Sequence, residues 1–220
     1  MSFDGLAPHY RWLERVLAGG LLQRARVAHI AVLDRARHVL LVGEGPGRFL
    51  EALRARSPSV SVTVVDASAA MLREAARSIA RQESATVELV QADLRVWHPP
   101  LAAFDAIVTP CVLDCFGPET LPTIIQRLAG SARPVADWLH IDFNVPPRGW
   151  RRARARAVHA LMYSVFRAAT RMEARVVTSP GPWLELAGFQ RLQVDEFSHG
   201  LIRSEHWHRL GADDERRGHR

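Results

Sequence analysis

The stretch HVLLVGEGPGRFL, residues 38–50, decides the fold. Residues 38–43 form a short apolar run typical of a buried strand, and GRFLEALRAR (47–56) has the apolar spacing of a helix. Three glycines, Gly43, Gly45 and Gly47, lie in the turn between them. Glycine permits positive φ and lets the backbone come close to a ligand. A strand, a glycine turn and a helix in this order indicate a site for a nucleotide-like cofactor.

Strands and helices alternate beyond this turn. Residues 59–66, 86–93, 104–110 and 135–143 are predicted strands, and 68–82 and 118–132 are predicted helices, the first capped by Ser68. This alternation predicts a parallel sheet covered on both faces. A long or broken helix at 146–174 follows, and then two more strands, within 180–197 and 201–210, which bring the predicted number to seven.

The rest of the chain is divided around this core. Residues 3–34 have helical spacing interrupted at Gly19-Gly20, so we expect residues 1–35 to form a helical lid. The core is expected over residues 36–210, with a helical insertion at about 146–178. Residues 211–220 are polar and are expected to be a frayed tail.

Composition excludes some chemistry. All 29 residues counted as Lys plus Arg are Arg, which excludes Schiff-base lysines and the P-loop lysine. The net charge of +6 indicates either a solvated Arg surface or attraction to an anionic partner. No apolar run approaches the roughly 18 residues that span a bilayer. The N-terminus also lacks the pattern of a signal peptide, so a cytoplasmic location is expected.

Cysteine and histidine give little sign of a metal. Cys111 and Cys115 are too few for a disulfide framework or a zinc cluster, and Cys111 is interpreted as a small packing residue near the cofactor. His206 and His208 in EHWH are either metal ligands or members of one face of a late strand. We favour the strand interpretation and expect no metal.

Two acids follow predicted strands. Asp66 lies some twenty residues beyond the glycine turn, where a carboxylate can accept hydrogen bonds from both ribose hydroxyls or can cap the next helix. Asp93 ends the third strand and can reach the amino group of an adenine. An NAD site of the form G-x-G-x-x-G would need glycine where this chain has Arg48, which weighs against NAD.

These motifs resemble those of class I S-adenosylmethionine-dependent methyltransferases over about residues 35–145. VLLVGEGPG, VVDASAAML, VQADL and FDAIVTPCVLDCF are similar to four successive family motifs, and the N-terminal segment resembles the small-molecule and quinone C-methyltransferase branch. The resemblance implies an α/β, Rossmann-like doubly wound sheet of seven strands. Its implied order is 3-2-1-4-5-7-6 with the last strand antiparallel, and its implied cofactor is S-adenosyl-L-methionine.

The family pattern also implies cofactor contacts. The glycines approach the methionine portion, Asp66 the ribose and Asp93 the adenine. The full implied set is Gly43, Glu44, Gly45, Gly47, Asp66, Ala67, Met71, Asp93, Leu94 and Thr109, the last beneath the sulfonium. The chain departs from the family at Leu41, where an acid usually stands. We interpret Glu44 as the substitute for that acid; pairing with a surface Arg is the alternative.

Catalytic and acceptor-binding residues are less marked. VLDCF (112–116) resembles the VLHHF of small-molecule methyltransferases, which makes Asp114 an acid–base group, a cofactor contact or a helix cap. His140, together with Asp142, is a candidate base or orienting group. Tyr10 and Trp150 are the candidate acceptor contacts, and Tyr163 is a further one. A core or surface position is the competing interpretation of each.

The predicted function is methyl transfer to a small hydrophobic or aromatic acceptor. A tRNA or rRNA methyltransferase and a non-catalytic binding protein on the same fold are the alternatives. Nucleic acid is not expected as a partner, because no RNA-binding module accompanies the arginines. The five arginines within residues 148–156 are a solvated helix face, a contact for an anionic substrate group or a peripheral membrane contact. The oligomeric state is not predicted.

Overall fold

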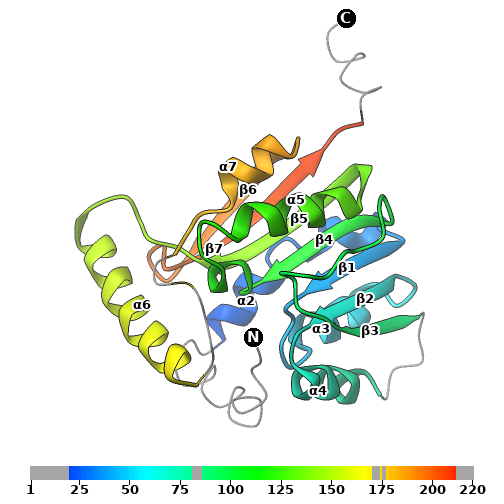
Figure 1. Ribbon diagram of the computed structural model, residues 1–220, viewed down its shortest axis with the longest axis horizontal. Coiled ribbons are helices and arrows are strands. Elements are labelled where there is room, and N and C mark those ends of the chain that lie inside the picture. The colour runs from blue at the N-terminus through cyan, green and yellow to red at the C-terminus, as the bar shows by residue number, and fades with distance from the viewer. Residues whose placement is uncertain (1–19, 81–85, 170–173, 175–176, 212–220) are drawn as a thin grey trace, which may run out of the picture.

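The computed structural model describes residues 20–80, 86–169, 174 and 177–211. Within them, seven strands form one sheet of order β3-β2-β1-β4-β5-β7-β6 (Figure 1). The first five strands are parallel, and β7 runs antiparallel to both of its neighbours, which confirms the predicted topology. The strands are β1 (His38–Val42), β2 (Ser61–Asp66), β3 (Val87–Gln91), β4 (Phe104–Pro110), β5 (Ala132–Phe143), β6 (Gln190–Phe197) and β7 (Ile202–Arg209).

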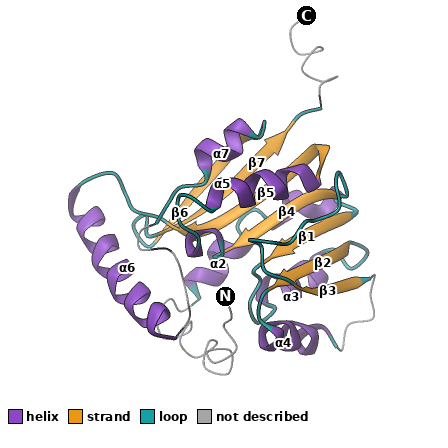
Figure 2. Cartoon of the chain, in the orientation of Figure 1, coloured by secondary structure: helices purple, strands orange, loops and turns teal. Residues whose placement is uncertain are grey.

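Helices cover both faces of the sheet (Figure 2). One face carries α2 (Leu21–Val27), α3 (Arg48–Arg56) and α4 (Ala69–Ile79), with the 3-10 helix η1 (Ile30–Arg35). The other carries α5 (Leu121–Ser131) and α7 (Gly181–Leu186), with the short 3-10 helix η2 (Leu113–Cys115) at the end of β4. Central strand β1 shows why both faces must be covered. Leu40 and Val42 point into one core layer, while Val39 and Leu41 point into the other.

Local signals place most boundaries close to their predicted positions. Ser68 caps α4 as predicted, because its hydroxyl accepts the Met71 N–H at 3.2 Å. Strand β5 begins at Ala132 rather than at residue 135. Ala132 pairs with Phe104 directly after α5, and a register irregularity follows before Asp137 pairs with Ala106. The early start therefore depends on pairing with β4.

The described part of the N-terminal segment is a layer of the core. Helix α2 contacts α3, β6 and β7, and residues Leu22, Ala25 and Leu33 are buried in the layer on that face of the sheet. Residues 20–35 thus pack on the sheet rather than over its end. Residues 1–19, which include Tyr10, and the tail 212–220 lie outside the described residues. No helix in the described part of the chain is long and apolar enough to cross a membrane.

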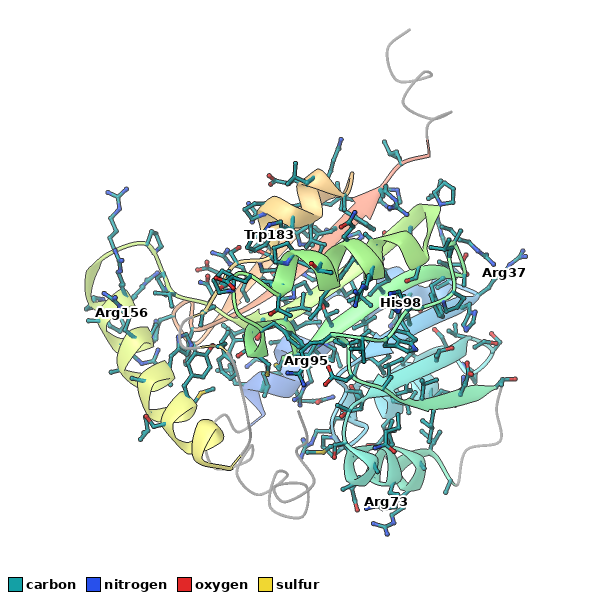
Figure 3. All side chains as sticks on the ribbon, viewed as in Figure 1. Arg37, Arg73, Arg95, His98, Arg156 and Trp183 are labelled. Atoms are coloured by element: carbon teal, nitrogen blue, oxygen red, sulfur yellow. The ribbon has the colours of Figure 1, made fainter. Side chains whose placement is uncertain are left out.

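Helix α6 (Gly149–Ala169) lies within the predicted insertion and stands at the end of the sheet (Figure 1). Its buried positions Ala155, His159, Met162 and Tyr163 recur every three or four residues, as one packed helix face requires. Its arginines are mostly exposed, and Arg156 lies on the side turned away from the sheet (Figure 3). The structure therefore presents the Arg-rich segment as a surface.

Candidate functional site

A cavity opens at the carboxyl ends of β1–β4, where the strand order reverses between β1 and β4. Ligands of open α/β sheets bind at such a switch point. The cavity has an empty volume of about 650 Å³, which includes its solvent-open mouth. Its lining is mainly apolar and consists of Gly43, Gly45, Val65, Asp66, Ala67, Met71, Ala92, Asp93, Leu94, Cys111, Val112, Cys115 and Phe116.

The three glycines of the turn have different surroundings. Gly43 (φ 67°) and Gly45 (φ 66°) line the cavity. A Cβ on Gly43 would lie 2.4 Å from the Cβ of Val112, so glycine lets the η2 turn close against β1. A Cβ on Gly47 would lie 2.8 Å from the Cα of Ala75 in α4. Gly47 is therefore a packing residue between α3 and α4, outside the cavity lining that was predicted to include it.

Glu44 turns into the molecule instead of facing the cavity. It is only 2% exposed, and its Oε1 accepts the backbone N–H groups of Phe49 at 2.5 Å and Leu50 at 3.1 Å. These donors belong to the first turn of α3, where N–H groups lack partners within the helix. The structure thus makes Glu44 a cap of α3 outside the cavity lining, and its contact with a cofactor stays a prediction. The signal missed in the sequence was an acid five residues before Phe49.

The acids at the ends of β2 and β3 both line the cavity. Asp66 accepts the Ser68 N–H at 2.8 Å through Oδ1 and the Gly45 N–H at 3.4 Å through Oδ2, which ties the glycine turn to β2. Asp93 accepts from the guanidinium Nε of Arg95 at 3.0 Å and from its backbone N–H at 3.0 Å. Hydrogen bonds from Arg95 hold the pKa of Asp93 well below its usual range, although partial burial opposes them. Asp93 is therefore ionised at neutral pH.

The remaining lining comes from expected and unexpected residues. Ala67, Met71 and Leu94 line the cavity, where the family pattern puts them, and so does Cys111, which has a positive φ of 56°. The η2 side of the lining, Val112, Cys115 and Phe116, was not predicted. Its position directly after β4 was the available signal, because the carboxyl ends of neighbouring parallel strands meet at one edge of the sheet.

Thr109 and His140 lie inside the packed core beneath the cavity rather than in its lining. The Thr109 hydroxyl accepts the Trp138 indole N–H at 3.0 Å and lies 3.3 Å from Nδ1 of His140. Burial lowers the pKa of His140 to about 4, so its imidazole is neutral at pH 7. Alternation along β4 and β5 directs both side chains into the layer under α5, so His140 does not face the cavity, and the predicted place of Thr109 beneath the sulfonium stays a prediction.

Asp114 and Asp142 form a buried carboxyl pair beside the cavity, 6% and 4% exposed. Asp142 accepts the backbone N–H of Asp114 at 3.0 Å and that of Phe143 at 2.8 Å. Burial raises the pKa of Asp114 to about 6. Burial, with the neighbouring charge of Asp114, raises the pKa of Asp142 well above its usual range. At pH 7 Asp114 is therefore mostly ionised, because its pKa of about 6 lies below that pH, and the same burial favours the protonated form of Asp142.

Helix α6 closes the other side of this pair. The Tyr163 hydroxyl donates to Asp114 at 3.4 Å, and the Cys115 thiol lies 3.6 Å from the other carboxyl oxygen of Asp114. His159 stacks on Tyr163 with ring centroids 6.1 Å apart, and burial lowers the pKa of His159 to about 4. Cys115 lines the cavity, and its thiol contacts Asp114. The Asp114 carboxylate is therefore separated from the cavity by one side chain.

Of the candidate acceptor contacts, Trp150 is not among the residues that line the cavity. Trp150 is 60% exposed at the start of α6 and faces the ring of His199, with centroids 5.3 Å apart. Tyr10 lies outside the described residues.

Known proteins are similar to parts of this chain in sequence and to most of it in fold. Residues 39–135 match the family described as "Methyltransferase domain". Trans-aconitate 2-methyltransferase of Paracidovorax citrulli (strain AAC00-1) is 36% identical over 117 residues, which are 51% of this chain and 42% of that one. Malonyl-[acyl-carrier protein] O-methyltransferase of Paenibacillus sp. (strain JDR-2) is 36% identical over 73 residues, 32% of this chain and 26% of that one. The chain thus spans less than half the length of these relatives.

A solved structure agrees over most of the chain. The 1,6-didemethyltoxoflavin-N1-methyltransferase of Burkholderia thailandensis, with bound 1,6-didemethyltoxoflavin and S-adenosylhomocysteine, has a TM-score of 0.66. It is 18% identical, and the match covers 94% of this chain and 85% of that one. At this identity the likeness shows the fold.

Proposed function

From the premise that residues 39–135 are a class I S-adenosylmethionine-dependent methyltransferase domain, we propose that the chain transfers a methyl group from S-adenosyl-L-methionine to a small acceptor. The observation that carries this proposal is the cavity at the β1/β4 switch point. It combines a glycine turn with one carboxylate from the end of β2 and one from the end of β3. The two acids and the small residues of the turn fit a cofactor that has a ribose, an adenine and an amino-acid end.

Each part of the lining suits one part of that cofactor. Asp66 receives backbone N–H groups and has the acceptor chemistry for ribose hydroxyls. Asp93 is ionised and accepts hydrogen bonds, as an adenine amino group requires. Met71 and Leu94 supply apolar surface for the flat base, and Gly45 leaves room beside the backbone for the methionine end. When bound, the cofactor supplies a methyl group on a sulfonium, a good leaving group for displacement by a nucleophile.

We assign the proton-accepting role to Asp114. A hydroxyl or amine acceptor gives up one proton when it becomes methylated, and a positioned base receives it. Asp114 is ionised at neutral pH and lies one residue behind the cavity wall, next to Cys115. Asp142 and Tyr163 act as positioning residues, because they hold Asp114 through hydrogen bonds. His140 has no part in this assignment, since it lies in the core with Thr109.

The acceptor we propose is neutral, hydrophobic or aromatic, and carries a dissociable proton. Val112 and Phe116 form an apolar wall on the η2 side, and within the part of the chain that the structure describes no arginine lines the cavity. The negative charge shared by Asp114 and Asp142 opposes an anionic acceptor. In this respect the chain differs from the relative that acts on trans-aconitate, an anion.

The first experiment is calorimetric titration of the chain with S-adenosylhomocysteine, with NAD as the control ligand. We expect one micromolar site for S-adenosylhomocysteine and no binding of NAD. Release of S-adenosylhomocysteine is then measured with a panel of phenols and aromatic amines, and with trans-aconitate as the anionic comparison. Failure to bind S-adenosylhomocysteine contradicts the proposed function. Binding with turnover of trans-aconitate alone contradicts the proposed acceptor class.

A further inference from the structure

A group of two histidines and one aspartate lies on the α2 face of the sheet, away from the cavity. Asp137 of β5 is paired with His208 of β7, and His206 is two residues from His208 on the same face of that strand. Oδ1 of Asp137 lies 2.8 Å from Nε2 of His206 and 2.8 Å from Nδ1 of His208. The three side chains therefore converge on one point.

We propose that Asp137, His206 and His208 bind a divalent transition-metal ion, with Zn²⁺ as the best-suited ion. One potential ligand atom from each residue lies within 4.8 Å of the other two. Tetrahedral Zn²⁺, with bonds of about 2.1 Å, separates its ligand atoms by about 3.4 Å. Small side-chain rotations therefore bring the three atoms around an ion without moving a strand. Two imidazole nitrogens select this class over Mg²⁺ and Ca²⁺, which prefer oxygen ligands.

The backbone under this site is held by the opposite face of the sheet. Trp138 follows Asp137, and Trp207 lies between the two histidines. These tryptophans are paired across β5 and β7, and both are completely buried in the core. Because neighbouring residues of a strand point to opposite faces, burial of the tryptophans fixes the direction of the three ligand side chains. A metal site needs this kind of rigid support.

Solvent can reach the three side chains from one side. His206 is 10% exposed, His208 25% and Asp137 26%. An ion held by three protein ligands keeps an open position that water can fill.

A third histidine lies next to this group but has other partners. The ring centroid of His29 is 6.4 Å from that of His206. Its Nε2 donates to the backbone oxygen of Ser204 at 3.3 Å and lies 3.7 Å from a carboxyl oxygen of Asp195. His29 therefore packs beside the site and connects it to β6, and we leave it out of the ligand set.

The position of the site determines what an ion would do there. Asp137 is paired with Ala106, near the start of β4, whereas the cavity lies at the other end of that strand. An ion would therefore tie β7 to β5 without touching the reacting groups, and it would stabilise the antiparallel side of the sheet by binding only the folded state. This inference departs from the sequence expectation that no metal is bound.

The test uses the full chain without a histidine tag, stripped of metal with a chelator. Zn²⁺ is titrated by calorimetry, Co²⁺ by its visible absorption, and thermal unfolding is measured with and without Zn²⁺. We expect one ion per chain, Co²⁺ bands typical of nitrogen and oxygen ligands, and a rise in Tm of about 5 °C or more at saturating Zn²⁺. Two histidines that only donate hydrogen bonds to Asp137 would give none of these signals.

Variants locate the ion. His208→Gln changes a partly exposed ligand, and we expect it to abolish both the one-to-one binding and the Tm shift. His98→Gln is the matched control, because His98 is exposed and lies outside the group. Circular dichroism establishes that each variant is folded, and Asp137→Asn provides a second ligand variant. The proposal is overturned if the wild-type chain binds no Zn²⁺, or if His208→Gln and Asp137→Asn bind it as the wild type does.

Discussion

Two pairs of aspartates at the same edge of the sheet differ in their surroundings. Asp66 and Asp93 face the cavity, and their carboxylates accept from backbone N–H groups and, for Asp93, from the Arg95 guanidinium. Asp114 in η2 and Asp142 at the end of β5 are almost completely buried, and the Asp114 N–H donates to the Asp142 carboxylate. The hydrogen-bond donors around Asp66 and Asp93 favour a charged carboxylate, whereas the burial of Asp114 and Asp142 disfavours it.

These surroundings suit one residue type to two different tasks in neighbouring parts of the molecule. A carboxylate that stays charged over a wide pH range is suited to hold the hydroxyl and amino groups of a ligand. A carboxyl group with a raised pKa is suited to receive and return a proton. In our proposal the β2–β3 side of the site therefore binds the cofactor, and the β4–β5 side handles the proton.

Loss of Asp66 has the largest expected effect and tests the binding side. Asp66→Ala removes an acceptor for two ribose hydroxyls and also the tie between Gly45 and β2. Hydrogen bonds to a charged group contribute about 1.5–3 kcal/mol each, so we expect S-adenosylhomocysteine to bind about 100-fold more weakly. Calorimetry measures this. Asp34→Ala, which removes a surface partner of Arg56, is the control and leaves the affinity unchanged. If Asp66→Ala binds S-adenosylhomocysteine as tightly as the wild type does, Asp66 does not contribute to cofactor binding.

Neutralising Asp114 tests the proton-handling side. The base is the ionised form, and burial raises the pKa of Asp114 to about 6, so kcat of the wild type is expected to rise from pH 5 to pH 7 with a midpoint near 6. Asp114→Asn is expected to lower kcat about 100-fold and to remove this rise. The measurement is kcat against pH with an acceptor from the screen. A variant that keeps the same midpoint shows that another group titrates.

Removing the hydroxyl that holds Asp114 has a smaller expected effect. Tyr163 donates to Asp114, and this hydrogen bond lowers the pKa of Asp114 against the effect of burial. In Tyr163→Phe the midpoint of the kcat profile should therefore move to higher pH, while kcat at pH 8 falls less than about 10-fold. A lower kcat at every pH without a shift of the midpoint would indicate a packing role alone.

Glu44→Gln has the smallest expected effect on the site and separates two roles for Glu44. As a cap of α3, the residue contributes about 1 kcal/mol to the free energy of unfolding, and this contribution falls when the charge is lost. Affinity for S-adenosylhomocysteine should stay within about twofold of the wild type. Urea unfolding and calorimetry measure the two quantities. A tenfold loss of affinity would restore Glu44 as the substitute for the acid absent at Leu41.

Much of the fold was predictable because it rests on local patterns. Buried strands such as 38–42 have continuous apolar runs, and the Ser68 cap needs only a contact three residues along the chain. The order of the strands came with the family resemblance, and the sheet confirms it. The approach of Asp66 and Asp93 to one cavity follows from the same order, since β2 and β3 end at the same edge.

The sequence by itself thus determined the fold class and which acids follow β2 and β3, where they line the cavity. Only the tertiary structure decided that Glu44 caps a helix, that Thr109 and His140 lie in the core, and which groups meet across the sheet. Tyr163 reaches Asp114 over 49 residues of chain, and His206 reaches Asp137 over 69. Such contacts depend on the strand register and on where α6 packs against the sheet. The periodicity within one segment specifies neither of these. The raised pKa values of Asp114 and Asp142 depend on such contacts too, because burial and neighbouring charges set them.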